Sequence, residues 1–291
     1  MNTTPSPHAD ERALVLAGGG AAGNAWQLGL IAGLADGGVN VSGADLIIGT
    51  SAGSTVAAQI TSGATPSELY AAILAEPAAP RGAGSERARA GRRYFDWSND
   101  IISASADAAD MRRRMGAAAV EASDAAASAR WRAIVAARLP GIEWPQQRVL
   151  VTSVDAGTGE PVVFDRDSGV ALVDAVAASS GNGYRIGERS FINGGNRRGE
   201  NADLAAGYGT VLVLSPFGGR TRTPREWGFD LATQVAELRA GGSTVETVFP
   251  DARAGDVFNP DALDPATRLP AARGGFEQGR DLTSRIAEIW T

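Results

Sequence analysis

The sequence predicts an α/β fold of three layers, in which helices cover both faces of a mostly parallel central sheet. Short continuous apolar runs alternate with longer segments of helical periodicity along most of the 291 residues, as in strands joined by crossover helices. Glycine accounts for 37 residues, about twice its usual share, and it gathers where apolar runs end. A chain of this length can bury a large core within one domain, which we expect over residues 12–291.

In the first half of the chain, two apolar runs each lead through a glycine-containing turn into a helical segment. The predicted elements are a strand over 13–17, a helix that ends near residue 35, a strand over 45–49, and helices over 53–63 and 65–75. The last helix opens with Thr65-Pro66-Ser67-Glu68, a capping box with proline at the first helical position. Residues 1–11 are polar and are predicted to be a flexible tail.

Residues 77–145 are predicted to be a helical insertion in the α/β core, either a lid or ordinary surface helices. Residues 77–99 are rich in Pro, Gly, Ser and Arg, which is typical of a mobile surface segment, whereas residues 105–138 are alanine-rich and helical. The arginine run 112–114 is expected to face solvent, with lipid headgroups as the alternative contact. Packing rather than ligand binding is expected for the tryptophans of this insertion, Trp97, Trp131 and Trp144.

The second half of the chain again alternates strands and helices. The predicted order is strands over 148–154 and 161–164, a helix over 170–178, a glycine-broken loop over 181–187, a strand over 210–214, a helix over 226–239, a strand over 245–249 and a helix over 276–290. The first two strands are expected to pair across a turn at residues 156–159. This alternation completes the pattern of a layered, mostly parallel sheet.

Composition excludes several kinds of chemistry. The chain has no cysteine and all 27 of its basic residues are arginine, which excludes a thiolate nucleophile, a disulfide and a Schiff-base lysine. The single histidine, His8, lies in the predicted tail, which argues against a histidine metal site and a Ser-His-Asp triad. The formal net charge is −6 and no long basic stripe is present, so nucleic acid is not an expected partner.

Hydropathy gives a further expectation about location. No run of 18 apolar residues is present, and the N-terminal residues lack the apolar core of a secretory signal. We therefore expect a cytoplasmic protein, and peripheral contact with a membrane is compatible with that location. The oligomeric state is not predicted by these patterns.

The strongest chemical signal is Gly49-Thr50-Ser51-Ala52-Gly53, which fits G-x-S-x-G between a predicted strand and a predicted helix. Such a turn raises a serine Oγ out of the sheet, and glycines on either side permit its tight backbone. The N-terminus of the following helix offers N–H groups to developing negative charge. The alternative is a tight turn in which Ser51 only caps the helix.

A second signal is the glycine-rich loop Gly18-Gly19-Gly20-Ala21-Ala22-Gly23. Consecutive glycines expose backbone N–H groups that bind an oxyanion or a phosphate. Gly18, Gly20 and Gly23 also satisfy G-x-G-x-x-G, the fingerprint of dinucleotide binding. That fingerprint requires an acidic residue at the end of the second strand, where this chain has Gly49-Thr50-Ser51, so we favour an oxyanion hole.

Together the two motifs resemble the patatin-like phospholipases. Members of that family place a glycine-rich oxyanion loop after the first strand and a G-x-S-x-G elbow about 30 residues later; here Ser51 follows Gly20 by 31 residues. The resemblance extends over most of residues 12–216 and to the C-terminal helix, and it includes the turn 193–195 and Asn201-Ala202-Asp203-Leu204. It implies a three-layer α/β/α fold, a Ser-Asp dyad, a lipid or small acyl ester substrate, and neither a metal nor an organic cofactor.

The sequence departs from the family pattern at the position of the dyad aspartate. The turn that carries it reads Asn193-Gly194-Gly195, and an amide is neutral and is not a base. The loop 181–187 is also shorter than in the family, and Ala22 stands where many relatives have a basic residue. Three explanations stay open: a variant inactivated by substitution, a relative with weak or no hydrolysis, or another carboxylate as base. Candidates for that carboxylate are Glu188, Glu200 and Asp203, of which Glu188 and Glu200 are expected to be solvated and Asp203 to open a structural corner.

The leading hypothesis is therefore a patatin-like serine acyl hydrolase in which Ser51 forms an acyl-enzyme and turnover is impaired. By the resemblance, backbone N–H groups of the loop 18–20 and of Ala52 stabilise the oxyanion, and Asn193 occupies the base position. The alternative is a module on the same scaffold that binds acyl chains or lipids without catalysis. Arg197 and Arg198, just after the dyad turn, are expected to form surface salt bridges, with phosphate binding as the alternative.

Overall fold

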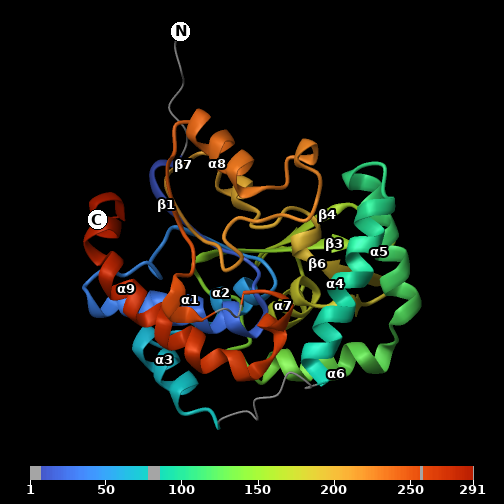
Figure 1. The fold of residues 1–291 in the computed structure, drawn as a ribbon, viewed down its shortest axis with the longest axis horizontal. Helices are drawn as coiled ribbons and strands as arrows, with labels where there is room; N and C mark the ends of the chain where they lie inside the picture. The colour runs from blue at the N-terminus through green and yellow to red at the C-terminus, as the bar shows by residue number, and fades with distance from the viewer. Residues whose placement is uncertain (1–7, 78–85, 256–257, 291) are drawn as a thin grey trace.

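The computed structural model describes residues 8–77, 86–255 and 258–290, and within these ranges an eight-stranded sheet forms the centre of the molecule (Figure 1). The strand order is β5-β6-β3-β2-β1-β7-β8, and β4 pairs with β3 outside this path. Strands β1, β2, β3, β7 and β8 are parallel neighbours, whereas β4, β5 and β6 join through antiparallel pairs. The strands span His8–Leu16, Leu46–Gly49, Arg148–Asp155, Pro161–Phe164, Asn182–Ile186, Arg189–Asn193, Tyr208–Leu214 and Thr244–Val248 for β1 to β8.

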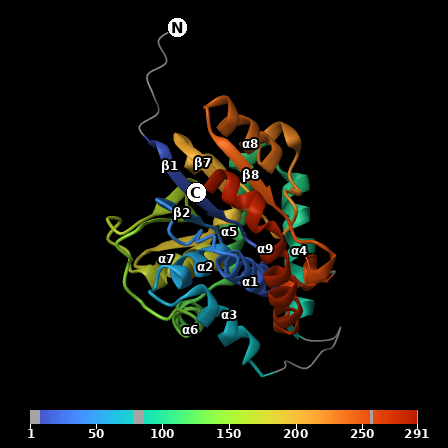
Figure 2. The ribbon, with the colours of Figure 1, turned by 90° about the vertical axis from the view of Figure 1, so that its left-hand side faces the viewer.

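Helices cover both faces of this sheet, as Figure 1 and Figure 2 show from two directions. Leu14 and Leu16 of β1 pack into a core formed mainly with α1, α2, α7 and α9, whereas Ala13 and Val15 pack on the other face against α8 and the short helix at 202–205. The predicted three-layer α/β/α class is thus confirmed. The helices α1 to α9 span Gly20–Asp36, Ala52–Ile60, Pro66–Leu74, Glu86–Ala104, Ala108–Ala122, Ala125–Ala136, Leu172–Ser180, Leu231–Ala240 and Arg268–Trp290.

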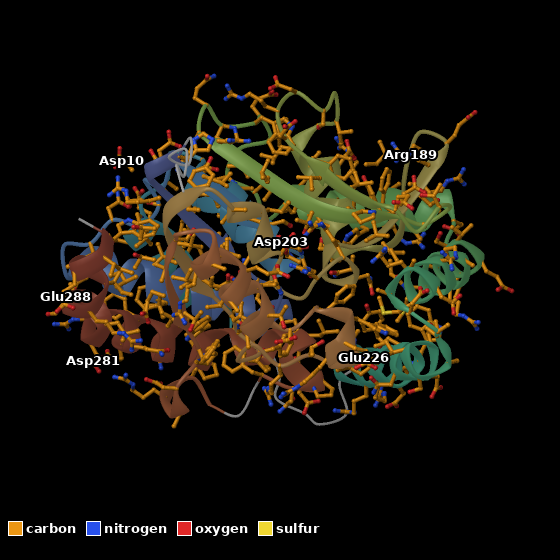
Figure 3. All side chains as sticks on the ribbon, turned by 90° about the horizontal axis from the view of Figure 1, so that it is seen from above. Asp10, Arg189, Asp203, Glu226, Asp281 and Glu288 are labelled. Atoms are coloured by element: carbon orange, nitrogen blue, oxygen red, sulfur yellow. The ribbon has the colours of Figure 1, made fainter. Side chains whose placement is uncertain are left out.

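The surface of the molecule carries most of its charge. Exposed acidic side chains, among them Asp10, Glu226, Asp281 and Glu288, project from the periphery (Figure 3), whereas Asp203 is half-buried. The tryptophans of the insertion are partly buried, and two of them donate to main-chain carbonyls, Trp131 to Ala177 and Trp144 to Val170. None of the helices in the described ranges combines the length and the apolar character that crossing a bilayer requires.

A predicted flexible tail and a predicted mobile surface segment both contain regular secondary structure over the residues that the structure describes. Strand β1 begins at His8, so residues 8–11 are strand rather than tail; the imidazole of His8 stacks on Tyr208 of the neighbouring strand at 4.7 Å between ring centroids. Residues 86–99, predicted as mobile surface, belong to α4, because apolar residues at helical spacing pack against the body of the protein. Residues 1–7 and 78–85 of these two predictions lie outside the described residues.

Two further elements differ from the sequence prediction, strand β5 and the start of helix α9, and glycine residues explain both differences. The predicted loop 181–187 is largely strand β5, because glycines at 183 and 187 adopt positive φ and allow a bulge and a tight turn inside a hairpin. Helix α9 begins at Arg268 rather than near residue 276. Its Gly274-Gly275 pair does not end the helix, because the missing side chains let neighbouring backbone approach closely.

Helices α1 and α9 pack so closely that glycine is required at the crossing. A Cβ on Gly29 would lie 2.1 Å from the carbonyl oxygen of Ala272, and a Cβ on Gly33 would lie 2.1 Å from that of Phe276. The indole Nε1–H of Trp26 in α1 donates to Gln278 Oε1 in α9 at 2.9 Å. This contact fixes α1, and therefore the glycine loop before it, against the C-terminal helix.

Replacing Gly29 with alanine should destabilise the protein by roughly 1–3 kcal/mol, because the new methyl group forces the two helices apart. Alanine would otherwise stabilise a helix relative to glycine by about 1 kcal/mol. Urea unfolding of Gly29→Ala beside Gly141→Ala tests this, since no atom lies within 4 Å of a Cβ at Gly141. Equal stability of the two variants would contradict the packing argument.

Candidate active site

Ser51 occupies the turn between β2 and α2, at the carboxyl end of the central strands. Its backbone has φ 54° and ψ −118°, a strained combination for a residue with a side chain, which typically costs about 1–3 kcal/mol. Glycines on either side make the turn sterically feasible. A Cβ at Gly53 would lie 1.9 Å from the Leu16 carbonyl oxygen, and one at Gly49 would lie 2.5 Å from Ser54 Cα. The turn predicted from G-x-S-x-G is therefore present.

Two serines hold this strained turn in place. The backbone N–H of Ser51 donates to Ser179 Oγ at 2.8 Å, and Ser54 Oγ donates to the Ser51 carbonyl at 2.6 Å. Ser179 lies in α7 and is fully buried. Nothing in the sequence points to Ser179, since a serine near a helix end 128 residues away gives no local signal of such a contact.

The glycine-rich loop passes directly beside Ser51. Because β1 and β2 are parallel neighbours, the loop after β1 and the turn after β2 leave the sheet at the same edge. A Cβ at Gly18 would lie 3.3 Å from Ser51 Cβ. Within the described ranges, the amide N–H groups of Gly18, Gly19, Gly20 and Ala52 donate no hydrogen bond to protein atoms. Four free donors near one hydroxyl, at the N-termini of α1 and α2, suit an oxyanion.

Asn193 is the side chain that faces Ser51 Oγ. It ends β6, an antiparallel neighbour of β3, in register with Ser153, and so it reaches the same edge as Ser51. Its Nδ2 donates to Ser51 Oγ at 2.9 Å, and its Oδ1 accepts from the N–H of Gly195 at 2.9 Å. Turning the amide over would place an NH2 group against the Gly195 N–H. The turn of Asn193 therefore directs a hydrogen-bond donor, not an acceptor, toward Ser51 Oγ.

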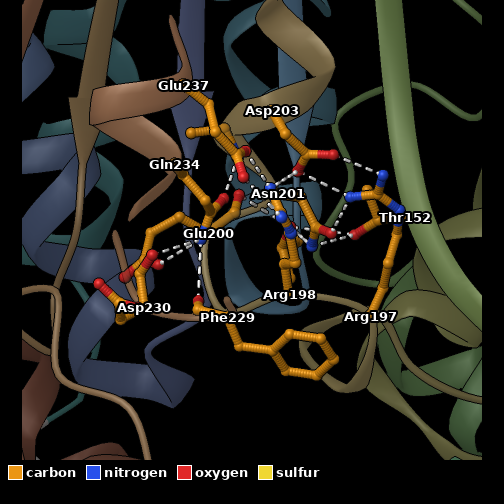
Figure 4. A network of polar contacts seen from close by, with 12 residues as sticks. Thr152, Arg197, Arg198, Glu200, Asn201, Asp203, Phe229, Asp230, Gln234 and Glu237 are labelled. Atoms are coloured by element: carbon orange, nitrogen blue, oxygen red, sulfur yellow. Dashed lines mark hydrogen bonds and ion pairs between the residues drawn. The ribbon is translucent and has the colours of Figure 1, made fainter. Parts of the chain in front are cut away.

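Asn201 connects the turn of Asn193 with the turn of Ser51, and Figure 4 shows its side chain beside Thr152 and Arg197. This fully buried residue has a left-handed backbone, with φ 59°. Its Nδ2 lies 2.9 Å from Thr50 Oγ1, 3.2 Å from Thr152 Oγ1 and 3.1 Å from the Gly194 carbonyl oxygen. In the sequence Asn201 stands out only as part of the family resemblance, whereas in the structure it joins both halves of the candidate site.

Arg197 and Arg198 form ion pairs and are not free to bind phosphate. Arg197 forms a bidentate pair with Asp203, with nitrogen–oxygen distances of 2.9 and 2.6 Å, and Arg198 pairs with Glu237 at 2.6 Å. Figure 4 shows these pairs around Asn201. The expectation of salt bridges is confirmed. In the arginine run 112–114, Arg113 and Arg114 are exposed as expected and pair with Asp110. The expectation is wrong for Arg112, which is half-buried and donates to the Gly159 carbonyl oxygen at 2.8 Å.

Of the three carboxylates considered as alternative bases, Glu200 alone lines the cavity that contains Ser51 and Asn193. Its expected solvation is wrong: the residue is 5% exposed and accepts a hydrogen bond from Ser215 Oγ at 2.8 Å. Burial raises the pKa of Glu200 to about 7. Glu188 is exposed, as expected, at the end of β6 remote from Asn193, and Asp203 is held by Arg197.

Two cavities meet at Ser51. The first, of about 430 Å³, is lined by the glycine loop, Asn193, Glu200 and the loop after β7. The second, of about 730 Å³, is lined by apolar and polar side chains of α1, α2, α3 and α6, with Glu76, Arg138 and Arg268 among the lining residues. Gly20 and Ser51 line both, so an ester bond at Ser51 would have room on each side. No group of three His, Asp or Glu residues in the described part of the chain is arranged to hold a metal ion.

The raised pKa of Glu200 predicts a pH-dependent stability. The folded state holds the proton more tightly than the unfolded chain, whose reference value is 4.5, so this stabilisation is complete below pH 4.5 and is lost as pH rises through 7. Glu200→Gln removes the ionisation. From pH 5 to pH 8 the native chain should lose about 2–3 kcal/mol relative to Glu200→Gln in urea unfolding. The exposed Glu226→Gln is the matched control, and parallel curves for Glu200→Gln and the native chain would refute the assignment.

Comparison with known proteins places the chain in a family. A search of curated proteins returns no match. Similar solved structures include VipD from Legionella pneumophila, at 13% identity, TM-score 0.44, and coverage of 94% of this chain and 67% of VipD. They also include the type III effector protein ExoU, at 15% identity, TM-score 0.34, and coverage of 95% of this chain and 54% of ExoU, so this chain spans about half of ExoU's length. A family model described as patatin-like phospholipase matches residues 14–183, which is more than half of the sequence, and the chain therefore belongs to the patatin-like phospholipase family.

Proposed function

We propose that this chain is a serine acyl hydrolase of lipid or other carboxylic esters whose turnover is strongly impaired by the amide at position 193. The observation that carries the proposal is the contact between Asn193 Nδ2 and Ser51 Oγ at 2.9 Å. A nucleophilic serine needs a partner that accepts its proton. Here the atom that faces Ser51 Oγ is Asn193 Nδ2, which is a donor. The Gly195 N–H holds the amide in this orientation because it donates to Asn193 Oδ1.

An aspartate at position 193 would supply the missing base. Its carboxylate would take the proton of Ser51 Oγ while Oγ attacks the ester carbonyl carbon, and the same proton would then go to the departing alkoxide. Water would next attack the acyl-enzyme, give a proton to the carboxylate and release the free acid, with the proton returning to Ser51. Through both steps, the free N–H groups of Gly19, Gly20 and Ala52 are placed to stabilise the negative carbonyl oxygen.

The surroundings argue against another carboxylate as the base. Asp203 is held by a bidentate arginine, and the Glu200 carboxylate is bonded to Ser215 rather than to Ser51. Glu188 is exposed at the remote end of β6. These contacts favour an inactive or weakly active site over a relocated base.

A second candidate function, binding of acyl chains without turnover, is favoured by the same amide contact. A donor at position 193 does not activate Ser51, yet both cavities at Ser51 remain large enough for a ligand. If the chain only binds acyl chains, the Ser51→Ala variant binds the ligand as the native chain does, and the native chain forms no covalent adduct.

Asn193→Asp should raise the rate of hydrolysis of a short-chain p-nitrophenyl ester by about 10²-fold or more, because it restores a general base. In a triad enzyme, the related loss of an orienting aspartate cost about 10⁴. The rates of the native chain and the variant would be compared under identical conditions.

The double variant Asn193→Asp, Ser51→Ala is the matched control and should be inert. Intact mass before and after the assay identifies any deamidation of Asn193 in the native chain, which would otherwise mimic the variant. No gain in a folded Asn193→Asp would refute the hydrolase proposal and support the binding function.

A further inference from the structure

The face of α2 that lines the second cavity is polar. Ser51, Thr55 and Gln59 line this cavity at intervals of four residues, the spacing that places side chains on one face of a helix. The opposite face of α2 packs into the core, where Val56 and Ile60 are buried. In ligand pockets, a few polar groups on a wall fix the orientation of the ligand and give specificity. The polar stripe of Ser51, Thr55 and Gln59 therefore indicates a ligand with hydrogen-bonding groups of its own.

The polar side chains farther from Ser51 are paired with one another across the cavity wall. Asn24 Nδ2 donates to Gln59 Oε1 at 3.0 Å, and Gln59 Nε2 donates to the Arg138 carbonyl oxygen at 3.0 Å. Arg268 donates to Asn24 Oδ1 at 2.8 Å and forms a bidentate pair with Glu76, with both nitrogen–oxygen distances 2.8 Å. These contacts satisfy the amide of Gln59, so the far end of the polar stripe is occupied by protein partners.

The hydroxyl of Thr55 forms no hydrogen bond to any protein atom in the described ranges, although the residue is only 6% exposed and lines the cavity. A threonine inside a helix commonly donates to the carbonyl four residues earlier. Here that carbonyl, of Ser51, accepts from Ser54 Oγ at 2.6 Å. A buried hydroxyl without a partner costs free energy, and a valine of the same shape would avoid that cost. A ligand that bonds to Thr55 in the cavity would offset it.

Thr55 lies one helical turn after Ser51, where an ester carbonyl would be attacked. An α-helix rises about 1.5 Å per residue, so the four residues from Ser51 to Thr55 span about 6 Å along α2. Side chains of a helix lean toward its N-terminus, which directs the Thr55 side chain back toward the turn of Ser51. A ligand group that bonds to Thr55 would therefore lie within a few carbon atoms of the ester carbonyl.

We propose that the second cavity takes acyl groups with a hydroxyl near the ester carbonyl, as in a 3-hydroxyacyl ester, and that Thr55 selects them. The inference rests on the proposed function in placing the ester carbonyl at Ser51, and it adds the class of acyl group. The Thr55 hydroxyl can both donate to and accept from a second hydroxyl. Apolar side chains of the same lining, Leu28, Leu69 and Ile73, pack against the remaining carbon chain. The acyl group is placed here because this cavity is the larger, at about 730 against 430 Å³.

Calorimetric titration of the full native chain tests the proposal without requiring turnover. The probes are ethyl 3-hydroxyhexanoate, ethyl hexanoate and 2-hydroxyethyl hexanoate, which carry a hydroxyl on the acyl side, no hydroxyl, and a hydroxyl on the alcohol side. The native chain should bind the first about 3- to 10-fold more tightly than the second, as expected for one hydrogen bond between uncharged groups. Thr55→Val should remove this preference and leave binding of ethyl hexanoate unchanged, whereas Thr55→Ser should keep the preference. Thr55→Val should not lower the melting temperature, because its hydroxyl has no protein partner to lose.

Thr61→Val is the matched control, because Thr61 ends the same helix, lies outside the cavity lining and donates to the Ala57 carbonyl at 2.7 Å. It should keep the preference and lower the melting temperature. Equal affinity of the native chain for the first two esters, or a preference that survives Thr55→Val, would overturn the assignment. So would a preference for 2-hydroxyethyl hexanoate that depends on Thr55, or a loss of stability in Thr55→Val, which would make the hydroxyl structural. These readouts do not depend on hydrolysis by Asn193→Asp, so failure of the hydrolase proposal is recognised separately.

Discussion

The contact between the end of β1 and the turn of Ser51 is the constraint on which the candidate site depends. The carbonyl of Leu16 occupies the space that a side chain at residue 53 would need, so the turn can lie against β1 only with glycine there. That contact brings the glycine loop beside the serine and leaves a cluster of amide donors free. Ser51 has a strained backbone in this same turn, and buried Ser179 holds it from a third element. The close contact and the local strain of the candidate site therefore lie in one turn.

Position 193 shows how a single atom decides the chemistry of this arrangement. The Gly195 N–H requires an acceptor and bonds to Oδ1 of Asn193, so the other terminal atom of that side chain faces Ser51. With an amide that atom is a donor, and with a carboxylate it would be a base. The surrounding network of Asn201, Thr50 and Thr152 contacts the main chain and hydroxyls of both turns. None of these contacts involves the side chain of Asn193, so the network holds the two turns together independently of the group at position 193.

Charge is distributed unevenly around the site. The arginines that follow the Asn193 turn are neutralised by Asp203 and Glu237, whereas those on the loop after β7 meet only neutral acceptors. Buried Glu200 lies between these regions and connects through Ser215 to the second loop.

The sequence by itself determined the fold class, the elbow and the glycine loop, because these depend on local rules: alternating apolar runs, glycine at tight turns and strand–turn–helix order. It also identified Asn193 as the unusual residue. Tertiary structure alone decided the roles of Ser179, Asn201 and Glu200, whose partners are distant in the chain. It likewise decided that β5 replaces a predicted loop and that α9 continues through Gly274-Gly275. In sequence alone a glycine pair indicates a helix break, yet Gly274-Gly275 permits close packing inside α9. A carboxylate is likewise expected to be solvated, yet the fold buries Glu200.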